Sequence, residues 1–195
     1  MKQIMLATAN AHKAEEFAAM LKPLGYTVKT LLELEEAIEI AETGTSFEEN
    51  ALIKARVIHE RLGIEVIADD SGLAVNALNG APGIYSARFM GRDTSYEVKN
   101  QYIIDQCKDV NDRGCQFVCA IAYVTADGRE YVFTGVVEGL VAEHIEGEGG
   151  FGYDPMFYYP PYKTTLANVS EEQKNKVSHR GRALAKLIAF MEMEN

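Results

Sequence analysis

Two adjacent carboxylates, Asp69 and Asp70, follow a short apolar run and precede Ser71 and Gly72. In α/β proteins, ligands bind beyond the carboxyl ends of strands, where acidic side chains can hold a cation. Adjacent carboxylates repel each other unless they are compensated, and Mg²⁺ suits them because it takes one or two carboxylates together with water and phosphate oxygens. The alternative is an acidic turn closed by an Asx hydrogen bond. The position of the pair favours a metal-binding or catalytic site.

A second candidate site lies in T-A-N-A-H-K, where an apolar segment meets a predicted helix, and it contains Thr8, Asn10 and Lys13. A helix N-terminus offers free backbone N–H groups and the positive end of its dipole, and lysine adds a compact charge suited to phosphate. The alternative is an asparagine that only caps the helix beside a solvated lysine, since the glycine-rich spacing of a P-loop is absent. The segment is therefore a candidate phosphate-binding site.

The glycine-rich segment G-G-F-G-Y-D-P, residues 149–155, is a third candidate. Closely spaced glycines let the backbone approach a ligand, and Phe151 and Tyr153 on either side of Gly152 can stack on a base. The carboxylate of Asp154 can accept hydrogen bonds from ring N–H groups. A hairpin in which the aromatic rings cover the glycines explains the pattern equally well.

Cationic side chains gather around the start of the last predicted helix, on a chain that is otherwise acidic: Lys174, Lys176, His179 and Arg180. A nucleotide needs only such a local cluster of cations. Alternatively, Ser178 simply caps that helix and leaves its neighbours exposed. One further acidic residue, Glu42, stands in the segment E-T-G, and it becomes a candidate only if the fold brings it near Asp70.

The composition limits the possible functions. The chain has 195 residues, a formal net charge of −10, 47% hydrophobic residues and 25% charged residues, which is typical of a globular protein. The negative charge argues against general binding to nucleic-acid polymers or to anionic membranes. No run approaches the roughly 18 apolar residues of a membrane-spanning helix, and the apolar stretch at the start is too short for a signal peptide. We expect a cytoplasmic protein that does not bind membranes.

The cysteines and histidines show no pattern typical of a metal site. There are three cysteines without a C-x-x-C motif, and Cys115 and Cys119 would lie about 13 Å apart on one strand, too far for a disulfide. We expect all three to be buried thiols in a reducing cytoplasm. The four histidines lack metal-ligand spacing, which argues against zinc.

Alternating strands and helices must position these residues. Apolar and capping patterns predict strands at residues 4–8, 26–31 and 65–69, the last entering a polar turn, and a hairpin of 116–125 and 130–137 around Asp127-Gly128. They predict helices after Asn10, after the capping boxes at 46–49 and 94–97, and at the end of the chain. We predict a single α/β domain over residues 1–195, with a mixed β-sheet, flanking helices and two lobes.

Six segments in this order resemble the inosine triphosphate pyrophosphatase family, the Ham1-like enzymes: T-A-N-A-H-K, E-T-G-T-S-F-E-E-N-A, A-D-D-S-G-L, G-A-P-G-I-Y-S-A-R, G-G-F-G-Y-D-P and V-S-H-R. The resemblance implies hydrolysis of the non-standard purine nucleotides ITP, dITP and XTP to the monophosphate and pyrophosphate with Mg²⁺. It also implies a mixed α/β fold with two lobes around a central cleft, and a homodimer.

The resemblance also implies a role for each matching residue. Those expected to contact the triphosphate are Thr8, Asn10, Lys13 and Lys54. Glu42 and Asp70 would hold Mg²⁺, Asp70 would also accept the proton of the attacking water, and Ser71 would contact substrate. The expected nucleoside pocket consists of Phe151, Gly152, Tyr153, Asp154, Lys174, His179 and Arg180. The chain departs from the family pattern at one position: many members have two acidic residues before T-G, whereas Ala41 precedes Glu42 here.

Two other functions remain open from the sequence. A Maf-like nucleotide pyrophosphatase has the same architecture and reaction but acts on other nucleotides, and the S-H-R and F-G-Y-D segments argue against it. A nucleotide sensor without turnover is the other alternative, and the presence of Asp70, Glu42 and Lys13 argues against that one. No Ser–His–Asp or Cys–His arrangement is evident, so we expect no covalent intermediate.

Overall fold

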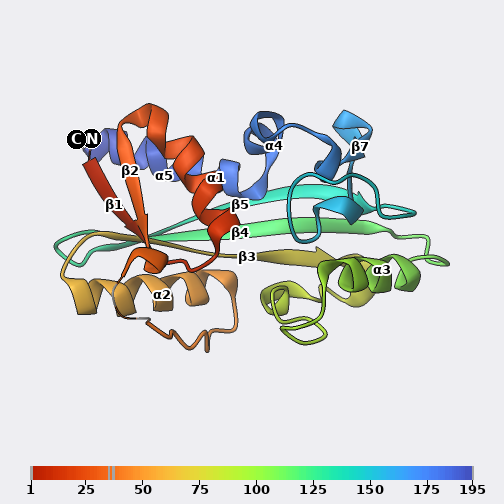
Figure 1. Ribbon diagram of the computed structural model, residues 1–195, viewed down its shortest axis with the longest axis horizontal. Coiled ribbons are helices and arrows are strands. Elements are labelled where there is room, and N and C mark those ends of the chain that lie inside the picture. Colours follow the sequence, from red (N-terminus) through yellow and green to blue (C-terminus); the bar gives the residue numbers. More distant parts are fainter. Residues whose placement is uncertain (1, 35, 37, 195) are drawn as a thin grey trace. The chain divides into compact units, whose positions relative to one another are not determined.

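The computed structural model describes residues 2–34, 36 and 38–194, and its central element is a seven-stranded sheet in the order β2-β1-β3-β4-β5-β6-β7 (Figure 1). The strands are β1 (Lys2–Leu6), β2 (Tyr26–Thr30), β3 (Val66–Val75), β4 (Gly114–Val124), β5 (Glu130–Val141), β6 (Phe157–Tyr159) and β7 (Thr164–Thr165). The α-helices are α1 (Ala11–Leu21), α2 (Phe47–Leu62), α3 (Tyr96–Gln106), α4 (Glu171–Val177) and α5 (His179–Glu194). β1 is parallel to β2 and β3, whereas β6 is antiparallel to β5 and β7, so the predicted α/β fold with a mixed sheet is confirmed.

The chain divides into two compact units. Unit 1 comprises Met1–Asp70, Cys119–Gly135 and Arg180–Asn195, and unit 2 comprises Ser71–Val118 and Val136–His179. The chain passes from one unit to the other between Asp70 and Ser71 and again between His179 and Arg180, within two of the predicted site motifs. The single domain over residues 1–195 and its central cleft stay predictions.

Unit 1 has an apolar core on each face of its part of the sheet. Side chains alternate along a strand, so Ile4 and Leu6 of β1 face α1 and α5, whereas Met5 faces α2. Figure 1 shows α1 and α5 on one side of these strands and α2 on the other. As predicted, Phe17 of α1 and the apolar stripe of α5 are buried in the first of these cores.

Local signals place the ends of the helices in unit 1. The side chain of Asn10 caps α1 by accepting a hydrogen bond from Lys13 N at 3.2 Å, and Ser46 caps α2 in the same way. α2 ends at Gly63, which has a φ of +66° in the left-handed region that glycine tolerates best. Both helices begin where the sequence predicts.

The third strand differs from the prediction. The sequence predicts a strand that ends at Asp69 and enters a polar turn, but β3 continues to Val75. Its neighbour β1 ends at Leu6, which pairs with Ile67, so Asp69 and Asp70 lie beyond the end of β1. The other neighbour of β3 in the sheet is β4, which lies on the side of β3 opposite β1. Polar side chains therefore do not end the strand.

Unit 2 is organised around one apolar core, to which β4, β5, β6 and α3 contribute. α3 begins after Ser95, one residue later than the 94–97 capping box suggests, because the Ser95 hydroxyl accepts from Val98 N at 3.3 Å. The sequence predicted neither the short strands β6 and β7 nor α4, whose seven residues carry too few apolar positions to show a period.

The central hairpin and the last helix match their predictions. Gly128 has a φ of +83° in the turn between β4 and β5, and Thr125 N donates to Arg129 O at 2.9 Å to close it. All three cysteines are free and buried. Within the part of the chain that the structure describes, no helix combines the length and apolar character required to span a bilayer.

Candidate active site

The predicted phosphate-binding segment folds as a turn that leads into α1. Asn10 N donates to the buried Thr8 hydroxyl at 3.2 Å, and the Asn10 side chain caps the helix. Lys13 lies in the first turn of α1, and its side chain is 15% exposed, so it is mostly enclosed rather than solvated. The three residues therefore converge at one helix N-terminus, which is the geometry that favours an anion.

Asp69 and Asp70 point to opposite faces of the sheet, although they are adjacent in sequence. Their neighbours on β3 show the alternation, because Ile67 belongs to the core beneath α1 and α5 while Ala68 belongs to the core beneath α2. Asp69 thus meets side chains from α1 and α5, and Asp70 meets side chains from α2. The two carboxylates have different partners, and each can be considered separately.

Asp69 is the centre of a buried ion-pair network. Its Oδ2 lies 2.9 Å from Lys13 Nζ and 3.4 Å from Arg180 Nη2, and Arg180 Nη1 donates to Glu16. Burial tends to raise the pKa of Asp69, but the charges of Lys13 and Arg180 outweigh it and hold the pKa well below the usual range. Asp69 is therefore ionised at neutral pH, and its charge stabilises this network.

Asp70 lies in a different electrostatic environment. Lys54 of α2 is 3.7 Å from Asp70 Oδ1 and 2.7 Å from Glu42 Oε1, so the loop carrying Glu42 and the strand carrying Asp70 meet at one ammonium group. Burial raises the pKa of Asp70, and Lys54 and Lys13 only partly oppose this effect. Glu42 was a candidate only if the fold placed it near Asp70, and the fold does so, because both carboxylates lie beside the ammonium group of Lys54.

One oxygen of Asp70 is poised for a ligand. Asp70 Oδ2 is buried and accepts no hydrogen bond from any residue that the structure describes. A buried acceptor without a donor is costly, by roughly 1–3 kcal/mol, unless a cation or a bound molecule satisfies it. Glu42 and Asp70 together offer the hard oxygen donors that Mg²⁺ prefers, so the residues present fit this ion. No three His, Cys, Asp or Glu side chains among the described residues form a metal site by themselves.

In unit 2, the glycine-rich segment folds around the carboxylate of Asp154. Asp154 Oδ2 accepts from Phe151 N at 2.8 Å and from Lys174 Nζ at 2.7 Å, and the same ammonium lies 4.6 Å from the centre of the Phe151 ring. Gly150 is required here, because a Cβ at that position would collide with Asp154. Phe151, Asp154 and Lys174 therefore form one connected group.

The remaining predicted nucleoside residues are largely buried. Tyr153 is 4% exposed, and its hydroxyl donates to Ser86 O at 2.7 Å. The His179 ring stacks on the Phe117 ring, with the ring centroids 4.9 Å apart. Ser71, the other predicted substrate contact, follows Asp70 on β3. Arg180 belongs to unit 1 and is 1% exposed in the Asp69 network. Contact between these side chains and a base stays a prediction.

Two residues of these clusters were not predicted from the sequence. Glu16 is buried and pairs with Arg180, and its one sequence signal is its place beside Phe17 on the inward face of α1. Asn100 is buried on α3 and donates to Gly152 O at 3.0 Å, and no local pattern marks it. Both depend on contacts with residues far away in the chain.

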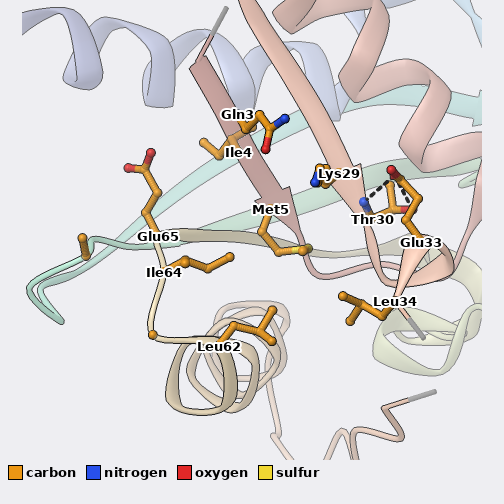
Figure 2. Close-up of a pocket in the computed structure, with 12 residues that line it drawn as sticks. Gln3, Ile4, Met5, Lys29, Thr30, Glu33, Leu34, Leu62, Ile64 and Glu65 are labelled. Atoms are coloured by element: carbon orange, nitrogen blue, oxygen red, sulfur yellow. Dashed lines mark hydrogen bonds between the residues drawn. The ribbon is translucent and has the colours of Figure 1, made fainter. Parts of the chain in front are cut away.

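A separate pocket in unit 1 contains none of the predicted site residues. Figure 2 shows it beside β1 and the end of α2, with Met5, Leu62 and Ile64 among the apolar residues and Lys29 and Glu33 among the charged ones that line it. The pocket is therefore separate from the candidate side-chain clusters described above.

Comparisons with known proteins show the family to which the chain is similar over nearly its full length. The model of the Ham1 family matches residues 4–190. A dITP/XTP pyrophosphatase from an Exiguobacterium species is 44% identical over 187 residues, which cover 96% of this chain and 95% of that protein. Another dITP/XTP pyrophosphatase, from Bacillus licheniformis, is 44% identical over 194 residues, which cover 98% of this chain and 99% of that protein. The structure of the Staphylococcus aureus Ham1 protein superposes with a TM-score of 0.89 at 43% identity and covers all of both chains.

Proposed function

The chain belongs to the Ham1 family, and we propose that it hydrolyses the non-standard purine nucleotides dITP, XTP and ITP to the monophosphate and pyrophosphate. Its full-length similarity to dITP/XTP pyrophosphatases supports this activity. Removal of such nucleotides keeps them out of DNA and RNA. The observation that carries the proposal in the structure is the Asp70 carboxylate, which is buried beside Glu42 and Lys54 and has one oxygen without a hydrogen-bond donor.

The phosphate chain of the substrate is assigned to unit 1. Lys13 and Lys54 supply positive charge, and Thr8 and Asn10 supply polar contacts at the N-terminus of α1. Hydrolysis between the α- and β-phosphates places negative charge on the leaving pyrophosphate, and cations held in a partly buried site stabilise that charge more than they would in water. The ion pairs of both lysines with carboxylates keep these ammonium groups in position before substrate arrives.

Glu42 and Asp70 would hold Mg²⁺. When bound there, the ion supplies charge neutralisation for the phosphate oxygens and helps to orient them. Asp70 accepts the proton of the attacking water, a role that suits a carboxylate whose pKa is raised by burial, because a more basic group is the better acceptor. Lys54 keeps Asp70 and Glu42 together. No covalent intermediate is required.

The nucleoside of the substrate is assigned mainly to residues of unit 2. Phe151, Gly152, Tyr153, Asp154, Lys174 and His179 of unit 2 form its pocket, with Ser71 and Arg180 as further substrate contacts. Hypoxanthine and xanthine carry a keto oxygen at position six, whereas adenine carries an amino group. Protein groups that donate hydrogen bonds at this position pair with the keto oxygen. Opposite the adenine amino group, itself a donor, they would be left buried and unpaired, at a cost of roughly 1–3 kcal/mol.

We also propose that the protein is a cytoplasmic homodimer in which both units act as one functional domain. One family model spans residues of both units, which supports the single domain. Three free, buried cysteines fit a reducing compartment. Analytical ultracentrifugation tests the dimer, which a sedimentation coefficient of a 21.6 kDa monomer at micromolar concentration would contradict.

The direct test of the activity is pyrophosphate release across a panel of nucleotides with Mg²⁺. We expect kcat/KM for ITP, dITP and XTP at least ~100-fold above GTP and ATP, because a site built on hydrogen bonds discriminates more strongly than an apolar slot. Excess chelator should abolish turnover, and Arg180→Ala should reduce the preference for ITP. Binding of ITP without pyrophosphate release would instead indicate a sensor, and equal efficiency on GTP would leave only a general nucleotide pyrophosphatase.

A further inference from the structure

The inward face of α3 carries two polar residues where a helix against an apolar core normally has hydrophobic ones. Lys99 is 1% exposed and Asn100 is 2% exposed, and both lie beside Ile103 and Ile104. Buried polar side chains are retained only where they are hydrogen-bonded, so the partners of these two residues indicate what the helix does.

Each of the two side chains donates to the backbone of a different loop. Asn100 Nδ2 donates to Gly152 O at 3.0 Å, within the glycine-rich segment, and Lys99 Nζ donates to Ala87 O at 3.0 Å, within the G-A-P-G-I-Y-S-A-R segment. The other end of the Asn100 amide, Oδ1, is buried and accepts no hydrogen bond from the residues that the structure describes. The donor end of Asn100 is therefore the part of the amide that is used.

Aromatic contacts hold the same loop against α3. The ring of Tyr96 packs edge-on against Tyr153 with the centroids 5.2 Å apart. Gly152 has a φ of +66°, and a Cβ at this position would lie 3.6 Å from the Tyr96 ring. The Tyr153 hydroxyl donates to Ser86 O at 2.7 Å, which links the glycine-rich segment to the second loop. The backbone at Gly152 is thus held on one side by Asn100 and flanked by Tyr96.

We propose that Asn100 is a positioning residue for base recognition, because it fixes the Gly152 peptide between the two aromatic residues of the nucleoside pocket. This inference rests on the proposed function, in which Phe151 to Asp154 recognise the base. A loop that is already ordered loses less conformational entropy when the base binds. The hydrogen bonds between loop and base are then offset less by that entropy and contribute more to selectivity. Loss of the Asn100 donor frees the peptide, which weakens recognition of the base and leaves the phosphate contacts intact.

The test compares Asn100→Asp and Asn100→Leu with the matched variants Gln101→Glu and Gln101→Leu. Gln101 is the next residue on α3, and it is exposed, so the same chemical changes are made away from the loop. Steady-state kinetics on dITP and dGTP give KM, kcat and the selectivity. Inorganic tripolyphosphate, which has no base, serves as a competitive inhibitor that reports on the phosphate contacts alone.

We expect both Asn100 variants to raise KM for dITP about tenfold or more, with a similar loss of selectivity over dGTP, while kcat and the Ki of tripolyphosphate change less than about threefold. The Gln101 variants should match the wild type. A parallel rise in KM and in the Ki of tripolyphosphate would show a general structural role and overturn the proposal, as would Asn100 variants that behave like the Gln101 variants. A wild-type protein inactive on dITP would refute the proposed function itself, a result distinct from both.

Discussion

The pKa values of the two adjacent aspartates are shifted in opposite directions. The pKa of Asp69 is lowered, because Lys13 and Arg180 outweigh the effect of burial, whereas the pKa of Asp70 is raised by burial. The charge of Asp69 therefore stabilises the fold above the ordinary carboxyl pKa of about 3.9, and this contribution is lost as the pH falls through its lower folded pKa. Removal of the charge should thus have different consequences at the two positions.

For Asp70→Asn we expect kcat on dITP to fall by about 10²–10⁴-fold or more, because an amide cannot accept the proton and is a poorer magnesium ligand. The melting temperature should stay within a few degrees of wild type. The control is Asp69→Asn, which leaves Arg180 without one of its buried partners and should destabilise the protein by roughly 3–5 kcal/mol. Pyrophosphate release and differential scanning calorimetry measure both effects. An Asp70→Asn variant that retains a tenth of wild-type activity would exclude Asp70 as the base.

Lys13 should contribute more to the affinity for nucleoside triphosphates than to the affinity for monophosphates. For Lys13→Ala we expect affinity for ITP to fall about tenfold or more, in the range of a lost charge-assisted hydrogen bond, and affinity for IMP to fall much less. Calorimetric titration with chelator present, which prevents turnover, provides both affinities. Lys22→Ala is the control, since Lys22 is exposed just beyond the other end of α1. Equal losses for ITP and IMP would place Lys13 outside the phosphate site.

At the level of the element, α2 depends on a glycine near each end for different reasons. Gly44 N donates to Asn50 Oδ1 at 2.8 Å, and a Cβ on Gly44 would lie 2.7 Å from that oxygen and 2.7 Å from Glu49 Cβ. Gly63 has nothing within 4 Å of such a Cβ, but its φ is +66°. The first position lacks space, and the second requires the left-handed conformation.

Gly44→Ala should displace the loop that carries Glu42, so we expect the Mg²⁺ concentration for half-maximal activity to rise several-fold, with destabilisation of about 1–3 kcal/mol. Gly63→Ala should destabilise by about 1 kcal/mol and leave the Mg²⁺ dependence unchanged, because only backbone strain is introduced. Mg²⁺ titrations of activity and urea unfolding distinguish these effects. A shared Mg²⁺ response in both variants would show that the loop does not position Glu42.

For the whole molecule, burial of its weakly acidic side chains predicts instability at high pH. Burial raises the pKa of Cys119 to about 12 and also raises the pKa values of Tyr123 and Tyr153. These groups keep their protons in the folded state after the unfolded chain has ionised. Their contribution to the free energy of unfolding is therefore complete below the ordinary thiol pKa of about 8.5 and is lost as the pH rises through the folded values.

We expect the free energy of unfolding, measured in urea, to decrease as the pH rises above about 9. We also expect the native protein to show no thiol that reacts with Ellman's reagent at pH 8, and all three to react after unfolding, because all three cysteines are buried and free. Rapid reaction of one thiol in the native state would show that its part of the core opens.

Much of the fold was predictable because its signals are local. Asn10 and Ser46 cap their helices, Gly63 ends α2 and Gly128 forms the hairpin, and each of these acts within a few residues of its position. β3 was predicted too short, because the polar residues after Asp69 indicate a turn locally, whereas the strand continues to Val75. β6 and β7, at three and two residues, are too short to show a pattern.

The sequence by itself determined the main helices, the first strands, the central hairpin, the family and the candidate site segments, because helix caps, turns and motifs consist of neighbouring residues. Only the tertiary structure decided which face of the sheet each of those side chains occupies and which partners it contacts. Strand alternation sends Asp69 and Asp70 to opposite faces, and the helix packed on each face supplies different partners, so one aspartate is paired with Lys13 and Arg180 while the other keeps an oxygen without a donor. Burial and charge at a side chain depend on residues brought together from distant parts of the chain, and no local pattern records them.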